Sequence, residues 1–308
     1  MTVSKTNKQT YIGSLQSNVG PVPSLQATIT TTTNWSVPSG VTSVYAVVVG
    51  AGCGGSWGSH TNMNPFGGRG GPGGHVGGSQ IPVTAGGSLS ITIGSGGQGG
   101  TGTTQTVGLP GGITRVTSGT FTLYANGAGT VFPSQGTTDV SYSSREETFG
   151  GTAAITTSAF SPTMTNINYV SSIGRGGYAL VGSWWFTEPN NIDRLAIGEV
   201  ARYGGGGGAS RHRPGWGAPG PTAGGGGGGT GSNIAYGGWS PSYTGGIGSN
   251  SGGGGGGAGY LGNGGAATGG FGGNGGIGGG GGGGGAANAD PVNSRGGTGG
   301  SGAVLIYY

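Results

Sequence analysis

The side chains of this chain that could carry out recognition chemistry lie in short segments between runs of glycine. Trp, Tyr and Arg are the residues that most often anchor interfaces, and Tyr with Asn, Ser and Gly is typical of binding loops. The candidate binding residues in these segments are Arg211, His212, Arg213, Trp216, Tyr236, Trp239, Tyr243, Asn288, Asp290 and Arg295. The alternative for the four aromatic residues is burial, as caps on the ends of a glycine-rich block.

No combination of residues predicts catalysis. A Ser/His/Asp set is not apparent, and the chain has only 7 acidic residues, too few to indicate the paired carboxylates of a glycosidase. GxGxxG strings arise by chance at this glycine content, and a phosphate-binding loop needs a lysine after glycine. The only lysines are Lys5 and Lys8. We therefore expect no enzyme activity and no cofactor.

The sequence also predicts no metal site. Cys53, His60 and His75 could ligate a metal by their chemistry, but their spacing matches no zinc pattern. Cys53 is the only cysteine, so an internal disulfide is excluded.

Charge and hydropathy exclude two further classes of function. Charged residues make up 6% of the chain and the net charge is +4. A nucleic-acid-binding protein needs a stripe of cations facing phosphates, and Arg211-His212-Arg213 is too small to form one. No apolar run approaches the length of a membrane span, and the first residues lack the apolar region of a secretory signal. We expect synthesis in a cytosol and no membrane insertion.

Four regions follow from composition. Residues 1–30 are polar and predict an extended attachment arm. Residues 31–136 predict an antiparallel β unit with glycine-rich runs, because 41–49, 89–93 and 120–125 are rich in alternating β-branched and aromatic residues. A short strand around Pro82 is predicted at a sheet edge, since proline cannot donate to a ladder. Residues 137–203 predict a β-rich insertion, and 204–308 a glycine bundle with protruding loops and a closing strand at its end.

Glycine occupies 87 of the 308 positions and needs a structural explanation. The α-helix is excluded by propensity, and collagen by the lack of a regular three-residue repeat. A left-handed polyglycine-II helix, similar to polyproline II, remains, and neighbouring helices of this kind would satisfy one another's N–H and C=O groups. The predicted fold class is mostly β, an antiparallel β unit combined with a bundle of polyglycine-II helices and essentially no α-helix.

Three motifs resemble the glycine-rich domain of bacteriophage tail-fibre proteins. They are Trp35-x-Val-Pro-x-Gly-Val-Thr-x-Val before a valine run and Gly-Ala-Gly-x-Gly-Gly, Leu89-Ser-Ile-Thr-Ile-Gly-Ser-Gly-Gly-Gln-Gly-Gly, and the ending Gly299-Gly-Ser-Gly-Ala-Val-Leu-Ile-Tyr-Tyr308. The glycine block is also similar to the tip adhesins of T-even-type long tail fibres. In those proteins a sandwich of polyglycine helices displays variable loops. This chain differs from them by its insertion at 137–203.

The resemblance implies a receptor-binding protein of the virion. It implies that the N-terminal region joins the tail-fibre shaft or other virion tail proteins. The displayed loops would bind a host cell-surface protein or glycan, after synthesis in the host cytoplasm. One alternative is a structural fibre or connector protein without receptor contact. Another is an ice-binding protein, which would need a flat Thr/Ser/Ala face and a regular three-residue spacing that we do not expect here.

Overall fold

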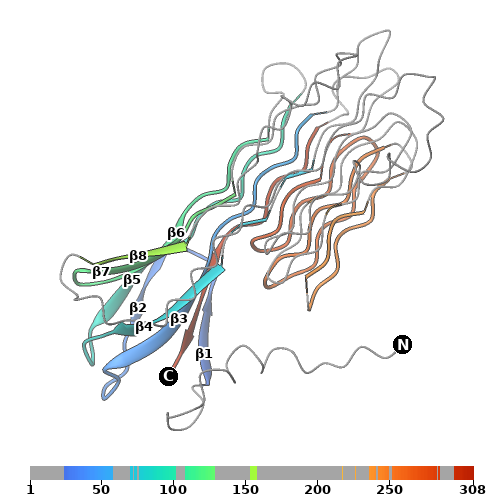
Figure 1. Cartoon of the computed structure of the whole chain (residues 1–308). Helices are drawn as coiled ribbons and strands as arrows, with labels where there is room; N and C mark the ends of the chain where they lie inside the picture. Colours follow the sequence, from blue (N-terminus) through green and yellow to red (C-terminus); the bar gives the residue numbers. More distant parts are fainter. Residues whose placement is uncertain are drawn as a thin grey trace, which may run out of the picture.

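In the computed structural model the described residues are 24–57, 70–71, 73–74, 76–101, 108–128, 153–157, 217, 226, 236–240, 242–249, 252–282, 284 and 295–308. They form two antiparallel β-sheets and an array of extended glycine-rich segments (Figure 1). None of these residues is helical. The predicted mostly-β class, with antiparallel sheets, is confirmed for this part of the chain.

The first sheet has four strands in the order β1 (Leu25–Ile29), β9 (Ala303–Tyr307), β3 (Ser43–Val49) and β4 (Val76–Pro82). Side chains alternate along β3 and place Val44, Ala46 and Val48 on one buried face, as the sequence predicts for a strand. β4 is an edge strand, which confirms the edge position predicted around Pro82.

The first sheet pairs β1 with β9, two strands that are far apart in the sequence. β1 lies within the range predicted as an attachment arm, but it pairs with β9, with Ile29 opposite Val304. β9 lies between β1 and β3, so the predicted closing strand is a central strand. Residues 1–23 of the predicted arm lie outside the described residues.

The second sheet contains the strands predicted near 89–93 and 120–125. Its order is β2 (Thr33–Ser36), β5 (Ser88–Thr92), β6 (Thr114–Ser118), β7 (Phe121–Ala125) and β8 (Ala153–Thr157). β8 lies within the predicted insertion at 137–203 and pairs with β7. The other residues of that insertion lie outside the part of the chain that the structure describes.

Apolar side chains from both sheets form one core between them. The first sheet contributes every second residue of β3 and β9, and the second contributes alternating residues of β5 to β7. Trp35 is partly buried and packs against this core, with 6.1 Å between its ring centroid and that of Tyr308. Packed sheets of this kind lie about 10 Å apart because side chains fill the space.

The strands continue directly into glycine-rich segments, where the two sheets come together (Figure 1). β3 leads into 50–57, β5 leads into 94–101, and β9 follows 295–302. At the junction, the N–H of Gly302 donates to the carbonyl of Gly94 at 2.8 Å, although these residues border strands of different sheets. Since glycine has no side chain, the side-chain layer is replaced here by contact between backbones.

Backbone hydrogen bonds between the glycine segments recur at every third residue. In segment 295–302, the N–H groups of every third residue donate to segment 94–101. The N–H groups of the residues that follow them donate to a different neighbour, segment 278–284. The donor and acceptor pairs are Gly296–Gly100, Gly299–Gly97 and Gly302–Gly94 for the first, and Gly297–Gly282 and Gly300–Gly279 for the second. Segment 271–278 lies parallel to segment 295–302. Its N–H groups donate to the carbonyls of the remaining residues of that segment: Gly272 to Arg295, Gly275 to Thr298 and Gly278 to Ser301.

The segments stack in layers. The inner layer consists of 50–57, 252–259 and 278–284, and its described residues are almost all buried. These segments have neighbours on all sides, so their glycine positions have no space for a side chain, and the few side chains that the layer does hold, such as those of Ala51, Cys53 and Ala258, are small. A Cβ built at Gly282, for example, would lie 1.9 Å from the carbonyl oxygen of Gly254.

The outer layer covers one side of the inner layer and exposes every third residue. It consists of seven segments joined by backbone hydrogen bonds: 236–240, 243–249, 262–268, 271–276, 295–302, 94–101 and 108–112. The exposed side chains of the first six, the outer face, are Tyr236, Trp239, Thr244, Ile247, Asn263, Ala266, Thr268 in a turn, Phe271, Asn274, Arg295, Ser95 and Gln98, with Thr298 half-buried. The expectation that the chain lacks three-residue spacing is therefore wrong for this layer.

One end of the glycine block rests on the first sheet. Tyr260, Leu261 and Ile277, in two turns of the block, pack against Val49 and Leu305 on the face of the sheet that points away from the sandwich core. We call this end proximal and the opposite end distal. The contact fixes the direction of each segment relative to the sandwich.

Candidate functional site

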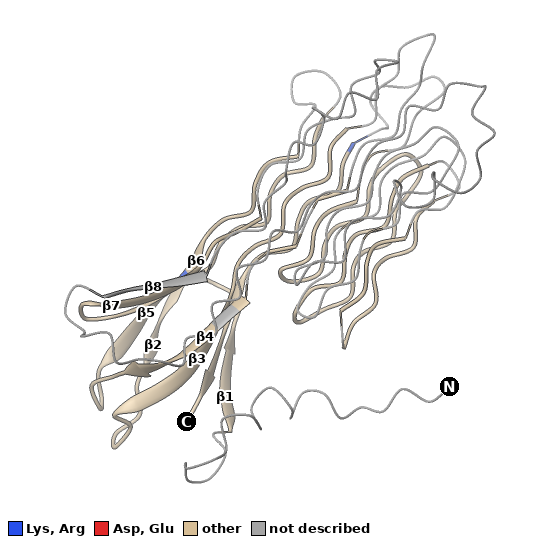
Figure 2. Ribbon diagram, in the orientation of Figure 1, with Lys and Arg blue, Asp and Glu red and all other residues tan. Residues whose placement is uncertain are grey.

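Side chains that could bind a partner are concentrated on the outer face of the glycine block. The inner layer presents almost only backbone, and its N–H and C=O groups are used in bonds between segments. Arg115 and Arg295 are the charged side chains of the described residues (Figure 2). Recognition at this face would therefore depend on aromatic and neutral polar groups, with one cation.

An aromatic cluster lies at the proximal end of the outer face. Ser240 and Tyr243 exchange backbone hydrogen bonds across a tight turn, and the hydroxyl of Ser240 donates to the carbonyl of Gly259 at 2.9 Å. This turn is tied to the inner layer, while Trp239 is 62% exposed and Tyr236 is 42% exposed. The alternative of burial as caps is wrong for these two side chains. Tyr243 is half-buried.

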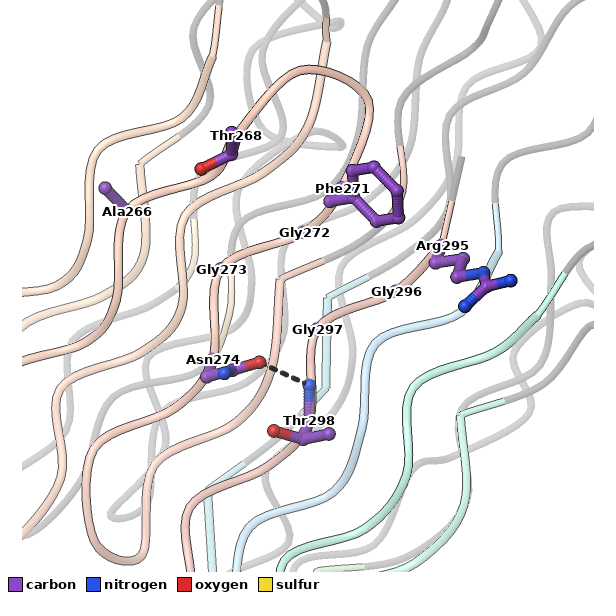
Figure 3. A pocket seen from close by; sticks show the side chains of 10 residues that line it. All are labelled: Ala266, Thr268, Phe271, Gly272, Gly273, Asn274, Arg295, Gly296, Gly297 and Thr298. Atoms are coloured by element: carbon purple, nitrogen blue, oxygen red, sulfur yellow. Dashed lines mark hydrogen bonds between the residues drawn. The ribbon is translucent and has the colours of Figure 1, made fainter. Parts of the chain in front are cut away.

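A hollow lies at the distal end of the outer face (Figure 3). It has a volume of about 350 Å³ and is lined by Ala266, Thr268, Phe271, Gly272, Gly273, Asn274, Arg295, Gly296, Gly297 and Thr298. Thr268 and Phe271 exchange backbone hydrogen bonds across the turn that forms one end of it. The floor is glycine backbone, so the shape of the hollow is set by which positions carry side chains.

The predicted site residues that the structure describes lie at the two ends of the block. Tyr236, Trp239 and Tyr243 belong to one turn and its flank at the proximal end, whereas Arg295 begins the segment that reaches the sheet at Gly302. At about 3.1 Å per residue that segment is roughly 20 Å long. The remaining predicted residues, Arg211, His212, Arg213, Trp216, Asn288 and Asp290, lie outside the described residues.

The sequence analysis did not identify Phe271, Asn274 and Ile247 as exposed on this face. Their signal is present in the sequence as triplets of one side chain followed by two glycines. Clear examples are Phe271-Gly-Gly-Asn274-Gly-Gly-Ile277, Arg295-Gly-Gly-Thr298-Gly-Gly-Ser301 and Ser95-Gly-Gly-Gln98-Gly-Gly-Thr101. Because the backbone hydrogen bonds of these segments recur at every third residue, such a triplet puts its side chains at equivalent positions along a segment.

Cys53 is buried in the inner layer, where its thiol lies 3.2 Å from the carbonyl oxygen of Leu109. The described residues contain no group of three or more His, Cys, Asp and Glu side chains that could hold a metal. His60 and His75 lie outside the described ranges. A search of the same described residues finds no helix long and apolar enough to cross a bilayer.

A protein-family model covers most of the chain. The model of a family described as the glycine-rich domain matches residues 27–308, and no curated protein matches the chain. The match begins within β1 and extends through both sheets and the glycine block to the last residue of the sequence. The chain belongs to the glycine-rich domain family.

Proposed function

We propose that this protein is a bacteriophage tail-fibre or tip adhesin that binds a host cell-surface receptor through side chains held on a glycine-rich scaffold. The observation that carries the proposal is the exposure of Tyr236 and Trp239 on a backbone fixed by hydrogen bonds on several sides. Aromatic side chains contribute large contact areas at low entropic cost when they are held rigidly. The motifs that resemble phage tail-fibre domains supply the biological setting.

We also propose that the glycine segments are polyglycine-II helices. Side chains of a β-strand alternate between its two faces with a period of two residues. The backbone hydrogen bonds between the glycine segments recur with a period of three residues. A left-handed helix with three residues per turn directs successive N–H groups to different neighbours. Segment 295–302 bonds to 94–101, 278–284, 271–278 and 50–57, some parallel and some antiparallel, as such a packing allows.

This architecture suits an adhesin because the scaffold depends little on the displayed side chains, apart from Asn263 and Asn274, whose amides accept hydrogen bonds from the neighbouring backbone. In the outer layer two residues of each triplet hold the backbone, and the third faces solvent. Substitution at the third position would alter binding without removing a core contact. By the same resemblance, we propose that the N-terminal region attaches the protein to the tail-fibre shaft or to other virion tail proteins.

A capture experiment tests the adhesin function. Immobilised full-length protein is incubated with purified outer-membrane and cell-wall fractions of candidate bacterial hosts. We expect one fraction to be retained, and Trp239→Ala together with Tyr236→Ala to reduce retention several-fold. Leu25→Ala, which removes a 50% exposed side chain from the sandwich, is the control and should retain wild-type capture. Exchange of segment 209–223, which contains Arg211, His212, Arg213 and Trp216, tests the predicted binding residues that lie outside the described part of the chain. Retention of no fraction, or retention unchanged by every variant, would contradict the proposal.

Two other functions remain as candidates for specific reasons. A structural connector of the virion would use the same scaffold, but the outer face would be covered by other chains in the assembled particle. The three-residue spacing of the outer face favours an ice-binding function more than the sequence suggested. Trp239 and Phe271 are bulky, however, and an ice-binding face is flat. An ice-recrystallisation assay separates this function from adhesion.

A further inference from the structure

We propose that the distal hollow is a binding site for an anionic sugar unit of a surface polysaccharide. The inference rests on the proposed function, because it names the class of receptor that one end of the outer face recognises. The hollow lies at the opposite end of the face from Trp239 and Tyr243, and it contains a different set of side chains. It therefore forms a second subsite, independent of the aromatic cluster.

The size of the hollow matches a small ligand. Its volume of about 350 Å³ is at the lower end of the range for ligand pockets, about 300–1,000 Å³. It is open to solvent and has a floor of glycine backbone between Phe271 and Arg295 (Figure 3). An open hollow with a flat floor suits one unit of a long chain whose neighbouring units continue over the surface.

Arg295 gives the site its preference for anions. It is the one cation of the described outer face, and the described residues contain no acidic side chain (Figure 2). No described residue forms an ion pair with it. A guanidinium group matches the geometry of a carboxylate or a phosphate and can bind either with two parallel hydrogen bonds.

Phe271 provides an apolar surface on the neighbouring segment. Its backbone position is fixed by the bonds between Thr268 and Phe271 and by the bond from Gly272 to the carbonyl of Arg295. The side chain is 37% exposed and lines the hollow. Its ring can pack against the C–H face of a sugar while the hydroxyl groups of the sugar remain available to polar partners.

Three polar side chains complete the lining. Oδ1 of Asn274 accepts a hydrogen bond from the N–H of Thr298 at 3.0 Å (Figure 3). This bond fixes the orientation of the amide, and no described residue accepts a hydrogen bond from its Nδ2 group. The hydroxyls of Thr268 and Thr298 add donors and acceptors. An anion-binding group, an aromatic ring and neutral hydrogen-bonding groups are the chemistry that an acidic sugar requires.

A polysaccharide fits better than the other anionic polymers. Binding to a nucleic acid depends on several cations along its phosphates, and the described outer face supplies one. A sugar with one carboxylate or one phosphate per unit needs a single cation. The aromatic ring and the amide then distinguish it from a simple anion.

Isothermal titration of the full-length protein tests the site with three probes: trigalacturonate, maltotriose and glucose 6-phosphate. We expect trigalacturonate to bind about tenfold more tightly than the neutral maltotriose, because only the acidic sugar can form charged hydrogen bonds with the guanidinium of Arg295. Glucose 6-phosphate distinguishes a phosphate-bearing from a carboxylate-bearing sugar. Tighter binding of either anionic probe than of maltotriose supports the site, and binding of neither contradicts it.

Four variants locate the binding. Arg295→Gln should remove the preference for the anionic probe, while Arg115→Gln removes the same charge from β6 and should leave it unchanged. Phe271→Ala should weaken binding of both acidic and neutral sugars about two- to tenfold, while Ile247→Ala, elsewhere on the outer face, should not. All four side chains are exposed, and circular dichroism checks that each variant is folded.

The outcomes separate this inference from the proposed function. If Arg115→Gln and Arg295→Gln reduce affinity equally, the site is wrong and the attraction is a general effect of charge. If no sugar binds but host fractions are retained through Trp239, the adhesin function stands and the distal site does not. If sugars bind as expected but no host fraction is retained, the site stands without the adhesin function.

Discussion

Asn274 and Thr298 form a reciprocal pair between two parallel segments of the outer layer. The side-chain Oδ1 of Asn274 accepts from the backbone N–H of Thr298 at 3.0 Å, and the carbonyl of Thr298 accepts from the N–H of Gly275 at 2.9 Å. The same arrangement occurs between Asn263 and Thr244, at 3.0 Å and 2.9 Å. In both pairs an asparagine followed by glycine lies beside a threonine. The amide therefore serves as the acceptor that a further glycine segment would otherwise provide.

The pair predicts a local effect of removing the amide. Asn274→Ala leaves the N–H of Thr298 without its acceptor, and because the site is exposed, water replaces the lost bond in part. We expect a loss of stability of about 0.5–1 kcal/mol and faster hydrogen exchange at the amide of Thr298, measured by NMR. Asn263→Ala is the matched control, since it should affect Thr244 and leave Thr298 unchanged. Equal protection of the Thr298 amide from hydrogen exchange in both variants would show that the Asn274 side chain does not hold this N–H.

The layers predict where alanine is tolerated in place of glycine. Gly282→Ala puts a methyl group 1.9 Å from the carbonyl oxygen of Gly254, so segments must separate. We expect the free energy of unfolding to fall by about 3 kcal/mol, at the upper end for overpacking. At Gly262 a Cβ has no neighbour within 4 Å, and Gly262→Ala should change stability by no more than about 1 kcal/mol. Thermal melts compare the two, and a similar loss in both would contradict the close packing of the inner layer.

The β-sandwich was largely predictable because local alternation specifies its strands. β3, β5 and β7 each place apolar residues at every second position. β1 was not predictable, since its sequence LQATI is only weakly apolar and its partner β9 is distant in the chain. Pairing of that kind depends on tertiary contacts, and no pattern within five residues contains it.

The outer face could have been read in part from the sequence. Pure runs such as Gly252–Gly257 and Gly278–Gly285 contribute to the inner layer, whereas the segments with one side chain in three belong to the outer layer. The distinction follows from space, because only a segment with an open side accommodates a large side chain at every third position. Which end of the block each side chain occupies was not predictable. It depends on the direction of each segment, and this is fixed by hydrogen bonds such as Gly302 to Gly94.

The burial of Cys53 predicts a thiol that reports opening of the glycine block. The thiol is fully buried, and the N–H of Gly281 donates to the carbonyl of Cys53 at 2.9 Å. A thiol reagent such as Ellman's reagent needs access to the sulfur. We expect native protein to react far more slowly than protein unfolded in guanidinium, and Gly282→Ala, beside this contact, to speed the reaction. Gly262→Ala should leave the rate unchanged. Rapid labelling of the native protein would place Cys53 at the surface and contradict the inner layer.

The environment of Tyr307 predicts a loss of stability at alkaline pH. Burial raises the pKa of Tyr307 above its ordinary value of 10.0, and the ring packs edge-on against Tyr45 with 6.4 Å between centroids. Below pH 10 the hydroxyl is protonated in both states, so its contribution to stability is fully present. As the pH rises further the unfolded chain ionises first, and this contribution is lost as the pH passes through the folded pKa.

Tyr307→Phe isolates this effect, because it keeps the ring and removes the titrating group. Denaturant unfolding between pH 8 and pH 11 should show the wild type losing stability relative to the variant as the pH rises above about 10. The other tyrosines titrate in both proteins, so their contribution cancels in the difference. If the two curves stayed parallel, or if the wild type gained stability relative to the variant, Tyr307 would not be held in an environment that disfavours its ionised form.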